Sequence, residues 1–265
     1  MSYLENLTYA TRYLALERYG QDQGNTLIKQ THKSEEKLFT LYRNLVNTRQ
    51  PLPASKDFFD AQDAMLQEAA RRKDIVEGTA LPSTSLHSNV HLWRGDITAL
   101  RVDAIVNAAN SQMLGCWVPG HYCIDNAIHT FAGIQLRLEC ARLMEEQGYP
   151  EPTGMAKITP AYNLPSSYVI HTVGPIANGH PSDLDRKLLA NSYTSCLDAA
   201  LSNGCQSIAF CCISTGVFGF PQKEAAHIAF TTVETWRACH PHSLQIVFNV
   251  FSKRDEEIYH ELLFN

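Results

Sequence analysis

The fold is decided by the stretch Ser207-Ile-Ala-Phe-Cys-Cys-Ile-Ser-Thr-Gly-Val-Phe-Gly-Phe-Pro221 together with the helical pattern that follows it. The apolar run over 207–213 has the length and composition of a buried strand. The small residues of 214–221 predict a loop that leads directly into a helical pattern at 222–239. A buried strand followed at once by a helix is the repeating unit of a parallel sheet, so this stretch predicts an α/β fold.

The same alternation continues on both sides of this stretch. Short apolar runs predict strands at 90–93, 103–108, 156–162, 167–173, 207–213 and 244–250, and helical patterns occupy 125–147, 184–203, 222–239 and 254–263. Because parallel strands need crossover helices, this order predicts a three-layer α/β domain. Ligands of such sheets bind at the carboxyl ends of the strands, so the segments after Val106, Ile213 and Val250 are the first candidates for a site.

The first part of the chain has a different pattern. Apolar residues recur at one-face helical spacing from about Ser2, after Ser34 and after Ser55, and a serine at the start of a helix can cap it. Residues 81–88 have the composition of a linker. We therefore expect a helical N-terminal extension over 1–88 that packs on the core of an α/β domain over 89–265.

Composition excludes several classes of protein. The chain has 265 residues, 45% of them hydrophobic, which is enough to bury a large core. A net charge of −5 disfavours a nucleic-acid partner that needs a broad basic face, and no apolar run is long enough to span a membrane. The 8 cysteines without an export signal indicate a reducing compartment. We expect a soluble cytoplasmic protein without nucleic-acid or membrane partners.

Two polar segments follow the strands predicted at 90–93 and 103–108. Asp96, in Gly95-Asp-Ile-Thr98, can accept a hydrogen bond from an exocyclic amine. Asn107 and Asn110 offer amide donors and acceptors that suit sugar hydroxyls. Taken alone, these three residues more often cap or form turns.

Three metal-ligand residue types, Cys116, His121 and Cys123, lie close together on the next segment. Two thiolates and an imidazole suit zinc, and three clustered ligands are typical of a site that keeps an open position. Asp125 is a further candidate, either as a ligand or as the group that holds a water. The alternative is a pair of free cysteines and a packed histidine. We interpret His129 as a buried helix residue. We interpret the remaining cysteines as small core residues: Cys140, Cys196, Cys205, Cys211, Cys212 and Cys239.

The loop over 214–221 is a candidate anion site. Small residues after a buried strand leave backbone N–H groups free, and the N-terminus of the following helix adds positive potential. The loop lacks the lysine of a P-loop, so ATP hydrolysis is not indicated. Taken by itself, a glycine-rich turn is more often only a turn.

Taken together, these motifs resemble the macrodomain family over about 90–265. The matching segments are Gly95-Asp-Ile-Thr98, Asn107-Ala-Ala-Asn110, Ile124-Asp-Asn-Ala-Ile-His129, His171-Thr-Val-Gly-Pro175, Ser214-Thr-Gly-Val-Phe-Gly-Phe-Pro221 and Phe251. Common macrodomains have a run of glycines where this chain has Cys116-x4-His121-x-Cys123. That departure is similar to the zinc-dependent macrodomains of bacteria and fungi, which also carry a helical N-terminal extension and whose bacterial members are often encoded beside a macrodomain-linked sirtuin.

The resemblance implies a three-layer α/β/α macrodomain with a mixed, mostly parallel six-stranded sheet and an ADP-ribose pocket. Asp96 and Ile97 would hold the adenine, Phe251 would stack beside it, and backbone donors of the 214–220 loop would hold the diphosphate. The binding residues so implied are Asp96, Ile97, Asn107, Asn110, Ser214, Thr215, Gly216, Val217, Phe218, Gly219, Phe220 and Phe251. Cys116, His121 and Cys123 would hold one zinc ion, and Asp125 and Asn110 would act at the distal ribose.

The implied activity is hydrolysis of the bond between the distal ribose and a protein side chain, releasing ADP-ribose. Such a bond breaks through an oxocarbenium-like transition state that nearby anionic groups stabilise. The implied partner is a mono-ADP-ribosylated protein, for which the sirtuin-linked group suggests a lipoyl-carrying glycine-cleavage H-like protein. Two alternatives are an ADP-ribose-binding module with a structural zinc and an O-acetyl-ADP-ribose deacetylase. A cysteine-nucleophile hydrolase fits less well, because neither Cys116 nor Cys123 has an evident histidine–carboxylate pair.

Overall fold

A six-stranded sheet forms the centre of the structure, a computed structural model that describes residues 1–31, 33–84, 89–241 and 244–264. The strand order is β2-β8-β7-β4-β6-β5. Every pair is parallel except β5–β6, which is antiparallel. This confirms the mixed, mostly parallel sheet. The strands are β2 (Val90–Arg94), β4 (Ala104–Ala108), β5 (Ala156–Pro160), β6 (Tyr168–Thr172), β7 (Ser207–Phe210) and β8 (Gln245–Val250).

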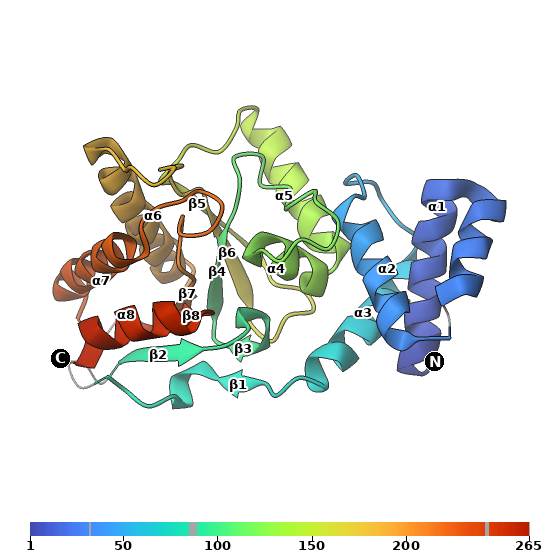
Figure 1. The fold of residues 1–265 in the computed structure, drawn as a ribbon, viewed down its shortest axis with the longest axis horizontal. Coiled ribbons are helices and arrows are strands. Elements are labelled where there is room, and N and C mark those ends of the chain that lie inside the picture. The colour runs from blue at the N-terminus through green and yellow to red at the C-terminus, as the bar shows by residue number, and fades with distance from the viewer. Residues whose placement is uncertain (32, 85–88, 242–243, 265) are drawn as a thin grey trace.

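Helices cover both faces of this sheet, as the three-layer prediction requires (Figure 1). One face carries α6 (Asp183–Ser202), α7 (Gln222–Cys239) and α8 (Lys253–Phe264), and the other carries α4 (Ile124–Ala132) and α5 (Ile134–Gln147). None of the helices in the described part of the chain combines the length and hydrophobicity that a bilayer crossing requires. Cys239 is exposed rather than buried, because α7 ends there at the surface.

Two predicted elements differ from the structure by more than the one or two residues seen at the ends of the others. The strand predicted to end at residue 213 ends at Phe210, because the Ile213 amide bonds the Cys211 carbonyl (2.9 Å) in a tight turn that stays buried. The single helix predicted over 125–147 is two helices, which meet at Gly133. Hydrophobic periodicity runs through both places, so the pattern alone did not show the break.

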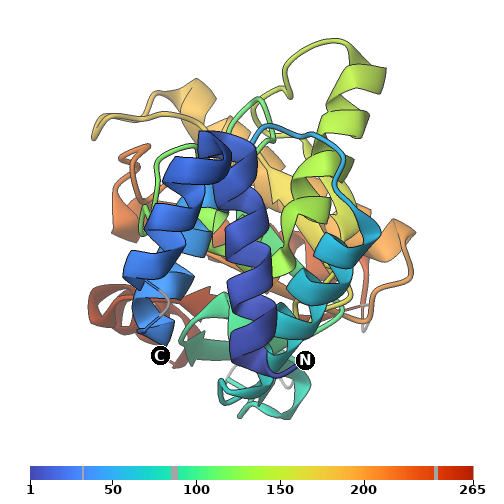
Figure 2. The same ribbon diagram turned by 90° about the vertical axis from the view of Figure 1, so that its right-hand side faces the viewer.

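Three further helices pack outside α4 and α5 (Figures 1 and 2). They are α1 (Tyr3–Thr31), which is interrupted at Gly20, α2 (Glu35–Asn47) and α3 (Lys56–Arg71). Ser34 caps α2, as predicted, and Ser55, after which a helix was predicted, caps α3. Their apolar faces form a second core, which Ile134 of α5 joins. The helical N-terminal region is thus confirmed.

The chain leaves the helical region before the predicted linker and forms part of a separate two-stranded sheet. The short strand β1 (Val76–Glu77) pairs in parallel with β3 (Leu100–Arg101), a contact that two-residue strands give no pattern to predict. Residues 85–88 of the predicted linker lie outside the described residues. The division of the chain at residue 88 therefore stays a prediction.

Gly133 separates α4 from α5 through its backbone conformation. Its φ of 95° and ψ of 171° lie in a region that only glycine adopts readily. A Cβ there would lie 2.6 Å from Gln135 Oε1 and 2.7 Å from Gln62 Nε2, two atoms that are themselves hydrogen-bonded to each other at 2.7 Å. Gln62 is fully buried, and its Oε1 accepts hydrogen bonds from the Tyr42 hydroxyl (3.0 Å) and the Ile134 amide (3.1 Å), so it has little freedom to move away.

We therefore expect Gly133→Ala to lower the free energy of unfolding by about 3 kcal/mol, since the new methyl group adds crowding to backbone strain. Gly148→Ala is the matched control, because Gly148 also has a positive φ (77°) but a Cβ added there would have nothing within 4 Å. It should cost only roughly 1–2 kcal/mol. Denaturant unfolding measures both values, and equal losses would show that the contact with Gln62 adds nothing.

Candidate functional site

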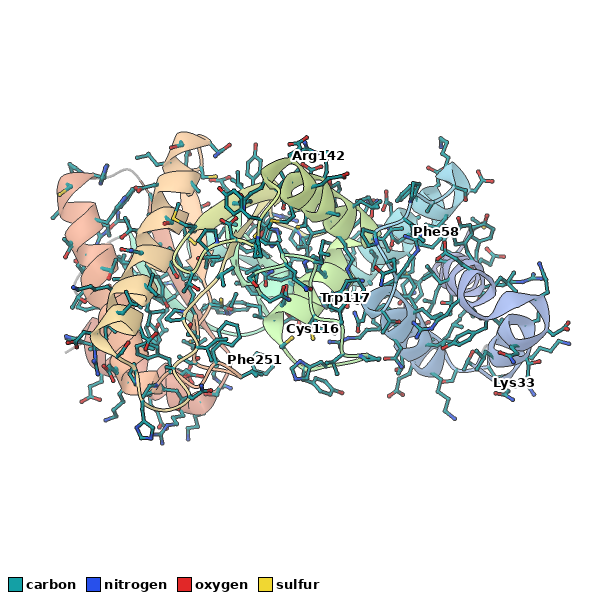
Figure 3. All side chains as sticks on the ribbon, turned by 90° about the horizontal axis from the view of Figure 1, so that it is seen from above. Lys33, Phe58, Cys116, Trp117, Arg142 and Phe251 are labelled. Atoms are coloured by element: carbon teal, nitrogen blue, oxygen red, sulfur yellow. The ribbon has the colours of Figure 1, made fainter. Side chains whose placement is uncertain are left out.

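The loop between β4 and α4 brings the three predicted metal ligands together. Cys116, His121 and Cys123 are partly exposed, and one ligand atom from each lies within 4.8 Å of the other two. Cys116 Sγ is 3.6 Å from His121 Nδ1. Cys123 also caps α4, where its Sγ accepts from the Asn126 amide at 3.4 Å. Figure 3 shows Cys116 and Phe251 on the same edge of the molecule, although they come from distant parts of the chain.

The donor set fits a tetrahedral zinc ion. Bonds of about 2.3 Å to sulfur and about 2.0 Å to nitrogen place the two ligand atoms roughly 3.6 Å apart. The separation of Cys116 Sγ and His121 Nδ1 agrees with this value. Burial is the main cause that raises the pKa of Cys123 to about 12, and the nearby Cys116 adds to it. A bound cation would oppose both effects, and three protein ligands would leave its fourth position open.

Asp125 is a buried carboxylate in the first turn of α4, two residues beyond Cys123. Its Oδ1 accepts from Asn107 Nδ2 at 2.8 Å. Burial raises the pKa of Asp125 to about 6, although the Asn107 hydrogen bond opposes that rise. A carboxyl group whose pKa is near neutral suits proton transfer at physiological pH. Asn107, predicted to bind substrate, is fully buried in β4, and the contacts that the structure shows for its amide are with Asp125 and His171.

A second group of potential ligands, His129, Cys140 and His171, lies beneath this carboxylate, again with the ligand atoms within 4.8 Å of one another. His171 Nδ1 is 3.1 Å from Asn107 Nδ2, and His171 Nε2 is 3.0 Å from Thr159 Oγ1. Since the amide nitrogen only donates, Nδ1 accepts and Nε2 carries the proton. Burial lowers the pKa of His171 to about 3, which keeps it neutral. His171 therefore offers no free lone pair, and this group is a hydrogen-bonded core.

His129 is buried on α4, as predicted, one helical turn from Asp125. Its Nε2 is 3.6 Å from Asp125 Oδ1, which is too long for a direct hydrogen bond. Neither ring nitrogen has a hydrogen-bond partner among the described residues. Burial lowers the pKa of His129 well below its usual range, so it is a neutral neighbour of the carboxylate.

The glycine-rich loop follows β7 and leads into α7, as predicted. Three of its amides are used locally: those of Thr215, Gly219 and Phe220 bond carbonyls of 212, 216 and 214. In the part of the chain that the structure describes, the amides of 216–218 have no intramolecular acceptor. The start of α7 also lacks a side-chain cap. These free donors are suited to an anion, and the binding of a diphosphate by the 214–220 loop stays a prediction.

The residues predicted to hold adenine lie at the ends of the neighbouring strands β2 and β8. Asp96 Oδ1 accepts from the Thr98 amide (3.0 Å), and its Oδ2 accepts from Lys73 Nζ (2.8 Å). Burial would raise the pKa of Asp96, but Lys73 and Thr98 outweigh it and hold the pKa below its ordinary value. Ile97 is buried, whereas Phe251, directly after β8, is 80% exposed and free to stack on a planar group.

Asn110 holds the start of the loop that carries the predicted metal ligands. Its Nδ2 donates to the Gly115 carbonyl at 3.1 Å, and its Oδ1 accepts from the Gln112 amide at 3.0 Å. The side chain is therefore engaged within the loop, and its predicted action on the distal ribose stays a prediction.

Arg137 of α5 supports the same loop and was not identified from the sequence. Its Nε donates to the Leu114 carbonyl (2.6 Å), and its Nη1 donates to the carbonyls of Val46 (2.8 Å) and Arg49 (2.7 Å). Its guanidinium lies 4.3 Å from the centre of the Trp117 ring. Burial is the main cause that lowers the pKa of Arg137 to about 10. No local pattern marks it, since its partners lie 23 to 91 positions away.

Comparison with known proteins agrees with this geometry. The family model described as Macro domain matches residues 106–229. A protein named protein-ADP-ribose hydrolase from Treponema medium is 58% identical over 233 residues, which cover 87% of this chain and 88% of that protein. A protein of the same name from Staphylococcus aureus is 50% identical over 229 residues, 86% of this chain and 85% of that one. A solved Trypanosoma brucei macrodomain in complex with ADP-ribose matches with a TM-score of 0.63 and 32% identity, covering 83% of this chain and 94% of that one. Relatives this similar over most of both chains, with the same fold, show that this chain belongs to the macro domain family.

Proposed function

We propose that this chain is a zinc-dependent protein-ADP-ribose hydrolase that removes mono-ADP-ribose from modified protein side chains. The observation that carries the proposal is the buried carboxylate of Asp125 beside the open donor set of Cys116, His121 and Cys123. Curated relatives of 50% and 58% identity that bear the hydrolase name support it. A module that only binds ADP-ribose needs neither a carboxyl group of near-neutral pKa nor a metal with a free position.

In the proposed reaction, water attacks the anomeric carbon of the distal ribose while the bond to the protein side chain breaks. Asp125 orients this water and accepts its proton as the new C–O bond forms, and the departing side chain takes up a proton from solvent as its bond to the ribose breaks. Asn107 holds the Asp125 carboxylate in place through its 2.8 Å hydrogen bond. A zinc ion held by Cys116, His121 and Cys123 would act as a Lewis acid that polarises the substrate and holds its orientation.

The rest of ADP-ribose would extend along the carboxyl ends of β4, β7 and β8. The free amides of 216–218 suit the diphosphate, and Phe251 is exposed for stacking on adenine. Asp96 and Ile97 lie at the adjacent end of β2, where the carboxylate retains accepting capacity for the adenine amine.

The substrate and its compartment are further parts of the proposal. Resemblance to the sirtuin-linked macrodomains favours a lipoyl-carrying glycine-cleavage H-like protein as the first modified protein to test. The free thiols of all cysteines, among them Cys116 and Cys123, favour the reducing cytoplasm as the compartment.

Asp125→Asn should lower the release of free ADP-ribose from a mono-ADP-ribosylated protein by roughly 10²–10⁴-fold, because the amide accepts no proton. The Kd for ADP-ribose should change little, since the substitution keeps the shape of the side chain. Asp183→Asn on α6, where the side chain is 95% exposed, is the control and should match the unmodified chain. Full-rate release by Asp125→Asn would rule out the proposed base.

Cys123→Ala should remove both the metal and the activity, because it deletes one of three protein ligands. Cys239→Ala removes an exposed thiol at the end of α7 and should keep both. Elemental analysis of the purified proteins and the same release assay, with and without a chelator, measure the effects. Undiminished turnover by a zinc-free Cys123→Ala protein would exclude the metal from the mechanism.

A further inference from the structure

Helix α2 of the N-terminal region reaches the metal-binding loop through Arg43. Arg43 Nε and Nη2 donate to Asn126 Oδ1 at 3.0 Å and 2.8 Å, and Nη2 also donates to the His121 carbonyl at 3.0 Å. The guanidinium therefore binds the main chain of one metal ligand. It also fixes the side chain of Asn126. The backbone N–H of Asn126 donates to Cys123 Sγ, so Arg43 is linked to a second ligand residue.

Asn47, the last residue of α2, makes the complementary contacts. It is 1% exposed, and its Oδ1 accepts from the Gly120 amide (3.0 Å) and from Asn126 Nδ2 (2.9 Å). Its own Nδ2 donates to Thr130 Oγ1 of α4 at 3.0 Å. Asn126 Nδ2 donates in turn to the Val118 carbonyl at 3.0 Å. Side chains from α2 and α4 thus hold the carbonyls of Val118 and His121 and the amide of Gly120.

The other supports of this loop lie mainly before His121: Asn110 and Arg137 bind the carbonyls of Gly115 and Leu114, and the His121 amide donates to the Val118 carbonyl at 3.2 Å. Between β4 and α4 it contains no strand or helix, and Val118 and Tyr122 are 56% and 96% exposed. A metal site binds tightly only when its ligands are already oriented, and groups that orient the ligands typically change metal affinity by about 10–100-fold. Loss of Arg43 or Asn47 would also leave the His121 carbonyl or the Gly120 amide without this partner, which would cost free energy of folding.

We infer that Arg43 and Asn47 are positioning residues of the metal site, so that the N-terminal helices complete the site as well as packing on the fold. Their side chains bind the loop and Asn126 rather than supplying ligand atoms of the donor set. They hold the loop so that His121 faces the two thiolates of Cys116 and Cys123. The inference rests on the proposed zinc dependence and extends it to residues far from the macrodomain motifs.

Arg43→Met and Asn47→Ala test this inference in the full-length chain. Competition with a chromophoric zinc chelator should show an affinity for zinc about 10–100-fold weaker in each variant. Turnover should be low at limiting zinc and should recover at saturating zinc, with an unchanged KM for the ADP-ribosylated protein. A variant that is merely destabilised would not recover in this way. Arg71→Met is the matched control and should bind zinc normally, since the one ion pair of Arg71 with the described residues is an exposed pair with Glu68 on α3.

Folding is checked by far-UV circular dichroism and by the melting temperature without metal. Asn47 is buried, so Asn47→Ala is the variant that is more exposed to a loss of folding stability. Arg43 is partly exposed, so Arg43→Met tests the inference with a smaller effect on stability. Normal zinc affinity in folded Arg43→Met and Asn47→Ala would overturn the inference and leave the proposed function intact. Failure of the unsubstituted chain to bind zinc would overturn both.

Discussion

One buried amide connects the parts of the molecule on which the proposed chemistry depends. Asn107 donates from Nδ2 to Asp125 Oδ1 at 2.8 Å and to His171 Nδ1 at 3.1 Å. These residues belong to β4, α4 and β6, so a single side chain ties the first turn of a helix to two neighbouring strands. Water does not compete for these bonds in the interior, which makes them strong and costly to lose. The position of Asp125, and with it that of Cys123, follows from this contact.

The outer helices supply what the loop cannot supply itself. A loop without secondary structure has backbone donors and acceptors that need partners from elsewhere. In the loop that carries the proposed metal ligands, Arg137 of α5 binds the carbonyl of Leu114 and Asn47 of α2 binds the amide of Gly120. The helical N-terminal region, whose apolar face packs on α5 through Ile134, is therefore continuous with the site in both packing and hydrogen bonding.

Most of the fold could be predicted because its signals are local. Each predicted strand of the sheet is present, and serine caps mark the starts of α2 and α3, since period and capping are properties of neighbouring residues. The errors have a common origin. In both places the apolar pattern continues where the secondary structure ends. At Gly133 it runs across the break between α4 and α5, and after Phe210 it runs into a buried turn.

The sequence by itself determined which chemical groups lie together along the chain: Cys116, His121, Cys123 and then Asp125 on one short segment, and a small-residue loop before a helix. Only the tertiary structure decided that Asn107 lies under Asp125, that its amide also binds His171, and that Asn47 reaches Gly120. These contacts join positions 18, 64 and 73 residues apart. They depend on strand pairing and on helix packing, neither of which leaves a repeating pattern in the neighbouring residues.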